Sequence, residues 1–355
     1  MVTALKTSIN ILLVFLFTAC TSVPDERMTP YVDFPETREL TARTLSLDSA
    51  LFRYPYRVRV QDDKAVVLDL HGTEYFFHAF HYPGFHYLSS FGKRGDAPEE
   101  MLSAENLRWN GNFLWTLDSN KSELTRLGFA SSGDSLLRLE TVSLDEELLR
   151  ALDFVQYDDS TFIIPDYSGD SRFCLVSRQG KLLRKIGTIP TANEDALKSA
   201  RPALAQAWRS FIDYNPRNGV LAAATQLGEV LEIYNLKDST HIVRIGPNGE
   251  PEFQISQGYG IPTGIMGFSD IQVTDSAIYV VFQGRAFKDI MQKAQQGINL
   301  PDGGQNIYVF SLEGKPLRKY VLDHYIHGIS VDEQKGIIIA TDVNKDEPII
   351  EYKLL

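Results

Sequence analysis

The feature of this sequence that most limits its fold is a unit of short strand-like segments that recurs along the chain. Within each unit, runs of four to seven residues are rich in β-branched and aromatic side chains and are bounded by Gly, Asn, Asp or Ser, which is typical of β-strands separated by turns. Six units follow one another at intervals of roughly 45 to 50 residues, with their clearest strands at residues 65–70, 113–118, 161–165, 219–223, 276–282 and 336–340. A repeat of this length with about four strands predicts a β-propeller, whose blades pack side by side around an axis.

The sixth unit lacks a convincing outer strand at its C-terminal end. The segment 40–47, Leu-Thr-Ala-Arg-Thr-Leu-Ser-Leu, alternates in hydrophobicity and is predicted to supply that strand. Pairing of segment 40–47 with the sixth unit would close the ring and remove two exposed sheet edges. We therefore expect an all-β fold, a six-bladed β-propeller spanning residues 39–355. A ring of five or seven blades and a stack of unrelated β-sandwiches are the alternatives.

Two stretches interrupt the strand pattern and predict short helical insertions. Residues 193–211 contain good helix formers, with Pro202 near the start of a second helical piece. Residues 285–297 place apolar side chains at three- and four-residue spacing, as on one side of a helix. Insertions in a propeller stand at one of its faces, where ligands bind. Each is interpreted as decoration of the scaffold, with a lid or a platform for a partner as the functional alternative.

One phrase carries a family resemblance. Residues 91–100, Phe-Gly-Lys-Arg-Gly-Asp-Ala-Pro-Glu-Glu, resemble the F-G-x-x-G-x-G-P-x-E phrase of six-bladed, TolB-like and NHL-like propeller lipoproteins of Bacteroidetes, with Ala97 where the family more often has Gly. Further similar segments lie at residues 267–271, 278–279, 306–310, 314–317 and 329–332. The resemblance covers most of residues 40–355 and implies a six-bladed propeller. It implies little about activity, because the family is largely uncharacterised.

The same phrase has a structural interpretation that needs no ligand. Gly92 and Gly95 suit the positive φ angles of a turn between two blades. Pro98 fixes a turn, and Glu99 is expected to cap the loop that leads into the next blade. We therefore expect residues 91–100 to connect blades rather than to bind.

The first 19 residues are typical of a secretory signal peptide. They contain a single charged side chain, Lys6, followed by an apolar run over residues 9–17 and the small residues Thr18 and Ala19. The run of about nine residues is too short for a transmembrane helix, which needs roughly 20. Residues 17–20, Phe-Thr-Ala-Cys, resemble the lipobox cut by lipoprotein signal peptidase, although Phe stands where Leu is usual.

This motif predicts that residues 1–19 are removed and that Cys20 receives a lipid anchor containing palmitate. An ordinary signal peptide followed by a chance cysteine is the alternative. Residues 20–38 contain three prolines and little periodicity, and they are predicted to form a tether between the lipid and the propeller. We expect a protein of the cell envelope that is lipid-anchored to the outer membrane, with its periplasmic and surface sides both left open.

The only other cysteine is Cys174, so a mature chain with lipid on Cys20 has no disulfide. Cys174 lies in the apolar run 173–176 and is predicted to be a buried small hydrophobic residue rather than a nucleophile. The net charge of the whole chain is −11. Such a surface repels phosphate backbones, so nucleic acid is excluded as a partner, and anionic lipid head groups are equally poor partners.

The sequence offers two sets of candidate metal ligands. His78 and His81 would face opposite sides of one strand, so they cannot share an ion. Neither a His-Glu-x-x-His nor a Cys-x-x-Cys motif is present, and structural roles are predicted for these two histidines and for His86, His324 and His327. Five aspartates beside blade strands are candidates for holding a hard cation such as Ca²⁺ in the central channel: Asp118, Asp166, Asp270, Asp332 and Asp342. We predict no cofactor, with this cation as the alternative.

The sequence contains no Gly-x-Ser-x-Gly nucleophile elbow and no P-loop, and no catalytic residue is assigned. The predicted function is therefore non-enzymatic: a tethered propeller that binds a protein, peptide or glycan with one face and its two insertions. One alternative is an enzyme of the propeller lactonase or lyase kind with a metal in the central channel. Another is a structural role in assembly of the envelope. Propellers host many functions, so the fold does not choose among them.

Overall fold

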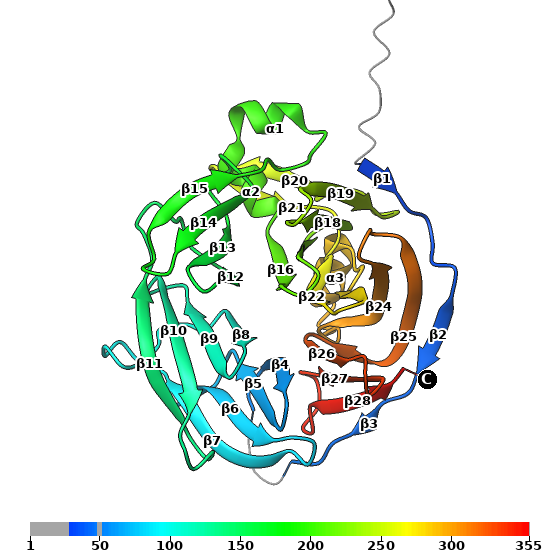
Figure 1. The fold of residues 1–355 in the computed structure, drawn as a ribbon. Coiled ribbons are helices and arrows are strands. Elements are labelled where there is room, and N and C mark those ends of the chain that lie inside the picture. The colour runs from blue at the N-terminus through cyan, green and yellow to red at the C-terminus, as the bar shows by residue number, and fades with distance from the viewer. Residues whose placement is uncertain (1–27, 48–51, 355) are drawn as a thin grey trace, which may run out of the picture.

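The computed structural model describes residues 28–47 and 52–354 and shows six antiparallel β-sheets arranged as blades around a central axis (Figure 1). The first strand of each blade lies next to the axis and the last lies at the rim, so the predicted six-bladed propeller is confirmed. Blade 1 contains β4 (Pro55–Gln61), β5 (Lys64–Asp69), β6 (Tyr75–His81) and β7 (His86–Lys93). Blade 2 contains β8 (Asn106–Asn110), β9 (Phe113–Asp118), β10 (Glu123–Phe129) and β11 (Leu136–Ser143). Blade 3 contains β12 (Val155–Asp158), β13 (Thr161–Pro165), β14 (Phe173–Ser177) and β15 (Leu182–Ile186). Blade 4 contains β16 (Ser210–Asn215), β17 (Val220–Thr225), β18 (Val230–Asn235) and β19 (Thr240–Ile245). Blade 5 contains β22 (Phe268–Val273), β23 (Ala277–Phe282), β24 (Gly304–Ser311) and β25 (Pro316–Ile326). Blade 6 contains β26 (Ile329–Asp332), β27 (Ile337–Thr341) and β28 (Ile349–Lys353).

The ring closes as the sequence predicts. The short strand β3 (Arg43–Thr44) pairs antiparallel with β28 and becomes the outer strand of blade 6. The backbone N–H of Leu45 extends this contact by donating to the carbonyl of Ile349 at 2.9 Å. Segment 40–47 therefore supplies the closing strand, although the paired part is only two residues long.

Two more strands from the N-terminal segment extend the rim. β1 (Met28–Pro30) pairs in parallel with β19 of blade 4, and β2 (Thr37–Leu40) pairs in parallel with β25 of blade 5. Tyr31 and Phe34, which lie between them, are buried, and both pack edge-on against the ring of Phe310. The predicted tether over residues 20–38 is thus too long at this end, because residues 28–38 are part of the propeller. Its prolines are compatible with a rim strand, which has an unpaired edge that needs no N–H donor.

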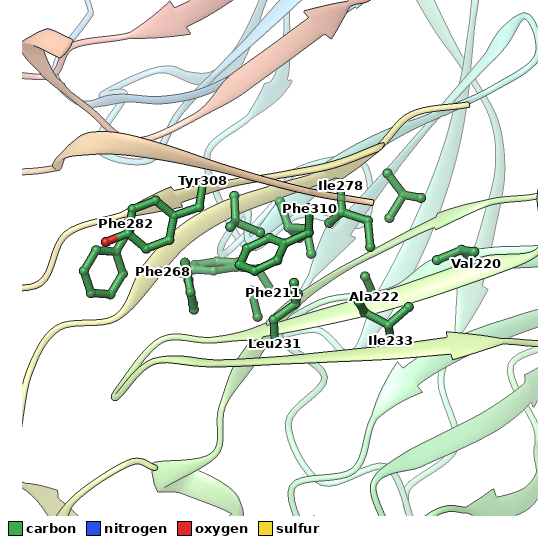
Figure 2. Close-up of a cluster of buried hydrophobic side chains, with 14 of the residues drawn as sticks. Phe211, Val220, Ala222, Leu231, Ile233, Phe268, Ile278, Phe282, Tyr308 and Phe310 are labelled. Atoms are coloured by element: carbon green, nitrogen blue, oxygen red, sulfur yellow. The ribbon is translucent and has the colours of Figure 1, made fainter. Parts of the chain in front are cut away.

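The core lies between neighbouring blades rather than within one sheet. Figure 2 shows the cluster that joins blades 4 and 5, where Phe211 and Leu231 meet Phe268, Ile278 and Phe310. Each blade is covered by another blade on both sides, so a second strand such as β17 is buried at all six positions. Burial on both faces gives these strands their continuous hydrophobic sequences, which explains why they were the clearest segments of the repeat.

The glycine phrase at residues 91–100 connects blades 1 and 2, as predicted. Gly92 has a φ of +65°, and a side chain at this position would meet the ring of Phe77. The turn is closed by Glu100 rather than by the expected Glu99. The Glu100 carboxylate accepts the backbone N–H of Ala97 at 3.3 Å and the ammonium group of Lys93 at 2.7 Å.

Both predicted helical insertions are present. α1 (Glu194–Ser199) and α2 (Arg201–Ala207) lie between blades 3 and 4, and α3 (Phe287–Gln295) lies within blade 5, between β23 and β24. A hairpin that the sequence analysis did not identify, β20 (Phe253–Ser256) with β21 (Tyr259–Pro262), connects blades 4 and 5. In the part of the chain that the structure describes, no helix has the length and apolar character needed to cross a membrane.

Candidate functional site

The first strands of all blades begin at the same face of the propeller, which we call the top face. The antiparallel order of the four strands places two kinds of connection there: the segment leading into each first strand and the turn between the second and third strands. The insertion with α1 and α2, the hairpin β20–β21 and the insertion with α3 are all connections of these kinds. The top face therefore gathers the irregular segments that carry binding sites on a rigid scaffold.

Charged side chains on or next to the first strands join the blades near the axis. Arg59 on β4 donates from both Nη atoms to the carboxylate of Asp270 on β22, each at 2.8 Å. Arg108 on β8 contacts Asp213 on β16 at 2.7 Å and Asp153, just before β12, at 3.0 Å. Each of the three aspartates also accepts a backbone N–H from the first strand of the following blade, at 2.7 to 2.9 Å. The carboxylates are therefore satisfied within the protein and link successive blades.

Burial and ion pairing act in opposite directions on these carboxyl groups. Burial alone would raise the pKa of Asp270, but the guanidinium groups of Arg57 and Arg59 outweigh it and hold that pKa below its ordinary value. For Asp213 burial dominates over the nearby Arg108, and the pKa is raised. Asp270 therefore remains ionised as the partner of two buried arginines.

Of the five aspartates considered as cation ligands, Asp270 and Asp332 lie on first strands, and Asp270 is buried in the charged network near the axis. It is already paired with Arg57, at 3.1 Å, and with Arg59, so a cation there would have to displace an arginine. The other four aspartates accept backbone N–H groups within their own turns: Asp118, Asp166, Asp332 and Asp342. Within residues 28–47 and 52–354 no group of three His, Cys, Asp or Glu side chains is placed to hold a metal ion. The predicted set of channel ligands is therefore wrong, because these side chains stabilise turns instead.

The histidines differ in what they contact. His78 bonds to the hydroxyl of Ser90 at 2.8 Å, and His324 bonds to Asp342 at 2.8 Å, in keeping with the structural roles predicted for both. His327 instead lies at the top face, next to a cavity. It is buried and bonds to Tyr54 and Asp302, which agrees with the predicted structural role and also fixes two residues that line this cavity.

The cavity has a volume of about 430 Å³ and opens at the top face beside the axis. Residues from five blades form its walls: Tyr54, Tyr56, Leu70, His71, Glu105, Leu152, Arg209, Phe211, Gln226 and Asp302. A second hollow, of about 820 Å³, lies at the rim between blades 2 and 3 and has no aromatic side chain in its walls. We take the first cavity as the candidate site because it combines enclosure, aromatic surface and convergent polar groups, and we call it the top pocket.

Aromatic rings form one wall of the top pocket. The ring of Tyr54 is stacked with that of Tyr56 at 6.1 Å between centroids and lies 4.7 Å from that of His71. Beneath them, the guanidinium group of Arg57 lies 5.0 Å from the ring centre of Tyr56 and 4.8 Å from that of Phe211. Arg57 is 1% exposed and is fixed by its ion pair with the channel network, so these rings are held by the scaffold.

A second wall contains three hydrogen-bonded polar groups. The hydroxyl of Tyr54 donates to Asp302, and Nε2 of His327 lies 3.1 Å from a carboxylate oxygen of Asp302 and 3.1 Å from the hydroxyl of Tyr54. The hydrogen bond from His327 holds the pKa of Asp302 well below its ordinary value, while burial and the bond to Asp302 raise the pKa of Tyr54. The His327 side chain is 7% exposed and that of Asp302 is 50% exposed, so the cluster reaches from the interior to the solvent.

Three buried polar atoms find no hydrogen-bond partner among the described residues. They are Nε of Arg209, which lines the pocket, Nδ1 of His327, which bonds to the lining residues Tyr54 and Asp302, and the hydroxyl of Tyr167, which is not a lining residue. Burial raises the pKa of Tyr167 to about 12, so this hydroxyl stays neutral and can donate. Arg209 lies 3.6 Å from Glu105, and both line the cavity. Because buried polar atoms usually have a partner, Nε of Arg209 is the atom of this set that a polar ligand in the pocket would satisfy.

Of the two cysteines, only Cys174 lies among the residues that the structure describes. Cys174 is buried on β14, in the hydrophobic cluster between blades 2 and 3. Burial raises the pKa of its thiol to about 12, so it is not a thiolate, and the predicted role as a small hydrophobic residue is confirmed. Cys20, the predicted lipidation site, lies outside the described residues.

The sequence matches the family described as TolB-like 6-blade propeller-like over residues 33–334. The chain belongs to this family. The resemblance carried by residues 91–100 is thereby confirmed for a TolB-like propeller, and the six-bladed architecture agrees with it. No curated protein matches the chain.

Solved structures agree on the fold of this TolB-like propeller. A protein from Bacteroides fragilis NCTC 9343, whose name describes it as exported, aligns with a TM-score of 0.55 at 10% identity over 92% of this chain and 98% of its own. A member of the DUF4221 family from Bacteroides vulgatus ATCC 8482 gives 0.53 at 10% identity, over 89% and 96% of the two chains. A streptogramin B lyase gives 0.50 at 11% identity, over 88% and 97%. At such identities the likeness concerns the fold alone.

The sequence analysis did not identify the top pocket. One signal was available in this TolB-like propeller: residues 52–56, Phe-Arg-Tyr-Pro-Tyr, place three aromatic side chains where the chain enters the first strand of blade 1. The remaining walls come from loops separated by up to about 250 residues, as for Tyr54 and Asp302. Nothing in the local sequence around Glu105, Arg209 or Asp302 indicates that they meet.

Proposed function

We propose that this protein is a tethered binding module whose ligand occupies the top pocket. The observation that carries the proposal is the composition of the pocket, whose walls combine the rings of Tyr54, Tyr56 and Phe211 with the polar side chains of Glu105, Arg209, Gln226 and Asp302. Aromatic faces supply contact area, while a few fixed polar groups select orientation. The six-bladed scaffold holds the aromatic rings and the polar groups in place.

The charges of the pocket favour a neutral polar ligand. Glu105 and Asp302 are opposed by Arg209, and His327 is engaged with Asp302, so neither sign dominates the walls. A volume of about 430 Å³ accommodates a short segment rather than a folded partner. Among protein, peptide and glycan partners we therefore favour a saccharide unit of a glycan, whose ring would lie on the tyrosines and whose hydroxyl groups would bond to the polar wall.

The tether is part of the same proposal. The signal peptide pattern and Cys20 support a lipid anchor, and the similar structure from Bacteroides fragilis, whose name describes it as exported, is consistent with an envelope location. Mass spectrometry of the mature N-terminus tests this: we expect a chain that begins at Cys20 and carries lipid. A cut elsewhere or an unmodified cysteine would remove the anchor from the proposal and leave the pocket untouched.

A binding experiment with matched variants tests the pocket. Purified protein is screened against an array of neutral glycans and uncharged peptides, and hits are measured by calorimetry. Truncating Tyr54 to Ala should weaken binding by about 2 kcal/mol, or roughly thirtyfold in Kd, as expected for a central aromatic contact. Tyr87→Ala serves as the control, because Tyr87 lies on β7 at the rim of blade 1. Equal affinities for the two variants would reject the top pocket as the binding site.

A second candidate, a hydrolase or lyase acting in the same pocket, is favoured by one arrangement. Tyr54, His327 and Asp302 form a hydrogen-bonded set of groups that can take up and release protons. If the protein is an enzyme of this kind, the array hit should be consumed over time, and His327→Gln should abolish consumption with little effect on Kd. A ligand recovered unchanged after prolonged incubation would leave the binding module as the function.

A further inference from the structure

The hairpin β20–β21 exposes apolar side chains without any charge among them. Ile255, Tyr259 and Ile261 are 55%, 61% and 47% exposed, and the ten residues from Phe253 to Pro262 include no Asp, Glu, Lys or Arg. This contrasts with a chain whose net charge is −11. A cluster of exposed apolar residues on one projecting element marks a contact surface.

The hairpin is rigidly attached to the propeller on one of its faces. The backbone N–H of Gly260 donates to the side-chain oxygen of Gln206 on α2 at 3.2 Å, and a Cβ at Gly260 would lie 2.4 Å from the carbonyl oxygen of Ala203. Gly260 therefore faces α2. Because alternate residues of a strand point to opposite faces, Tyr259 and Ile261 point away from α2. Ile255 pairs with Gly260 and therefore lies on the other face of the hairpin.

The described chain begins beside this hairpin. Met28 packs against the hydrophobic cluster that includes Leu204 and Trp208, and Phe253 at the base of the hairpin packs against the same cluster. Figure 1 shows β1 at the rim of the propeller on the side that carries α1, α2 and the hairpin. Seven residues separate Cys20 from Met28 in the sequence, so the two cannot be more than about 29 Å apart even if the chain between them were fully extended.

We propose that the hairpin β20–β21 is a membrane contact, which docks the rim of the propeller on the bilayer surface through Tyr259 and Ile261 on one face of the hairpin and Ile255 on the other. The inference rests on the lipid at Cys20, which belongs to the proposed function. A lipid placed within this reach keeps the bilayer at high effective concentration next to the hairpin, so a weak contact is sufficient to orient the protein. Apolar side chains and a tyrosine suit the boundary between head groups and acyl chains.

The charge of the protein explains why this contact is uncharged. A surface with a net charge of −11 is repelled by anionic head groups, so electrostatic attraction cannot hold the propeller against the bilayer. An uncharged apolar element avoids this repulsion and partitions by burial of apolar area. Docking at this rim also leaves the opposite rim, with blades 1 and 6, away from the membrane (Figure 1).

The proposal is tested with the full lipidated chain in phosphatidylcholine vesicles that contain lipids brominated in their acyl chains. A polarity-sensitive fluorophore is attached at position 259 in Tyr259→Cys and, as the matched control, at position 87 in Tyr87→Cys on blade 1. We expect a blue shift of the emission and quenching by the brominated lipids at position 259, and neither at position 87. The thiol of Cys174 is buried and remains unlabelled, which the parent chain treated in the same way verifies.

Two further results separate the possible outcomes. Adding Ile255→Ser and Ile261→Ser to the labelled Tyr259→Cys chain should abolish the quenching while the protein still floats with the vesicles on its lipid. Mass spectrometry of the same sample reports whether Cys20 carries lipid. If lipid is present and position 259 is quenched no more than position 87, the hairpin contact is rejected while the anchor stands. A blue shift that requires added envelope proteins would likewise overturn it, since the hairpin would then bind a protein.

Discussion

The insertion with α2 and the insertion with α3 were both predicted to be helical from the sequence but have opposite relations to the core. In α2, four of seven residues are buried, and Leu204 is 0% exposed. In α3, none of the nine residues is buried, and Met291 is 59% exposed. The first insertion is part of the packing of blade 4, whereas the second stands on the top face.

The attachments of the two insertions differ accordingly. The carbonyl oxygen of Trp208, at the end of α2, accepts a hydrogen bond from Arg172, which is itself paired with the buried carboxylate of Glu232 at 2.6 Å. The insertion with α3 is held near its C-terminal end, where the backbone N–H of Asp302 donates to the side chain of Asn344 at 2.8 Å and the Asp302 carboxylate meets His327. An apolar stripe thus predicts a helix, but not whether the core or a ligand will cover it.

The largest effect that this comparison predicts is at Leu204. Replacing Leu204 by Ala leaves a cavity in a fully enclosed site, so we expect the free energy of unfolding to fall by about 2 to 5 kcal/mol. Denaturant titration followed by far-ultraviolet circular dichroism measures the loss. The matched control is Ile290→Ala on α3, which should change the unfolding free energy far less. Equal losses at the two positions would show that α3 packs against the core after all.

The difference between the helices also illustrates which parts of this fold the sequence can predict. The second strands were evident because both faces of each blade are covered, which selects uninterrupted apolar residues. The first strands were not, because Arg59, Arg108, Asp213 and Asp270 interrupt their apolar pattern. These charges are tolerated only because they pair across the axis, and the partners of Arg59 and Arg108 are 211 and 105 residues away in the sequence. Pairing at such separations has no local sequence signature.

The candidate site was harder to predict for a related reason. An aspartate after a second strand, such as Asp118 or Asp342, accepts N–H groups of its own turn, while one on a first strand, such as Asp270, meets arginines at the axis. Strand position alone does not separate the two roles, because Asp332 ends a first strand and still accepts an N–H group of its own turn. The role depends on whether an arginine of another blade reaches the carboxylate. The N-terminal strands β1 and β2 were missed because three prolines between residues 20 and 38 resemble a tether, whereas a rim strand accepts proline.

A smaller effect is expected where the α3 insertion meets the pocket. The hydrogen bond from His327 lowers the pKa of Asp302 in the folded protein, so the contact stabilises the fold fully above the unfolded value of about 3.9. That stabilisation is lost progressively as the pH falls below this value towards the folded pKa. Since Asp302 is half exposed, we expect no more than about 1 kcal/mol from the pair.

Comparison of the parent chain with Asp302→Asn measures this contribution. Unfolding free energies taken between pH 7 and pH 3 should show a constant difference above about pH 4 and a shrinking one below it. Asp289→Asn is the control, because Asp289 is an acidic residue in the first turn of α3. A difference that stays unchanged down to pH 3 would mean that the carboxylate charge of Asp302 does not hold the insertion.

The smallest effect is expected on the exposed side of α3. Met291→Ser replaces a side chain that is 59% exposed and lies on a helix without buried residues, so the unfolding free energy should change by less than about 0.5 kcal/mol. The same substitution becomes informative when the ligand found with the glycan and peptide array is added. If α3 acts as a lid, Met291→Ser should weaken binding several-fold while leaving stability unchanged, whereas a decorative helix leaves both unchanged. A marked loss of stability without ligand would contradict the contrast between the two insertions, because it would require Met291 to be packed in the free protein.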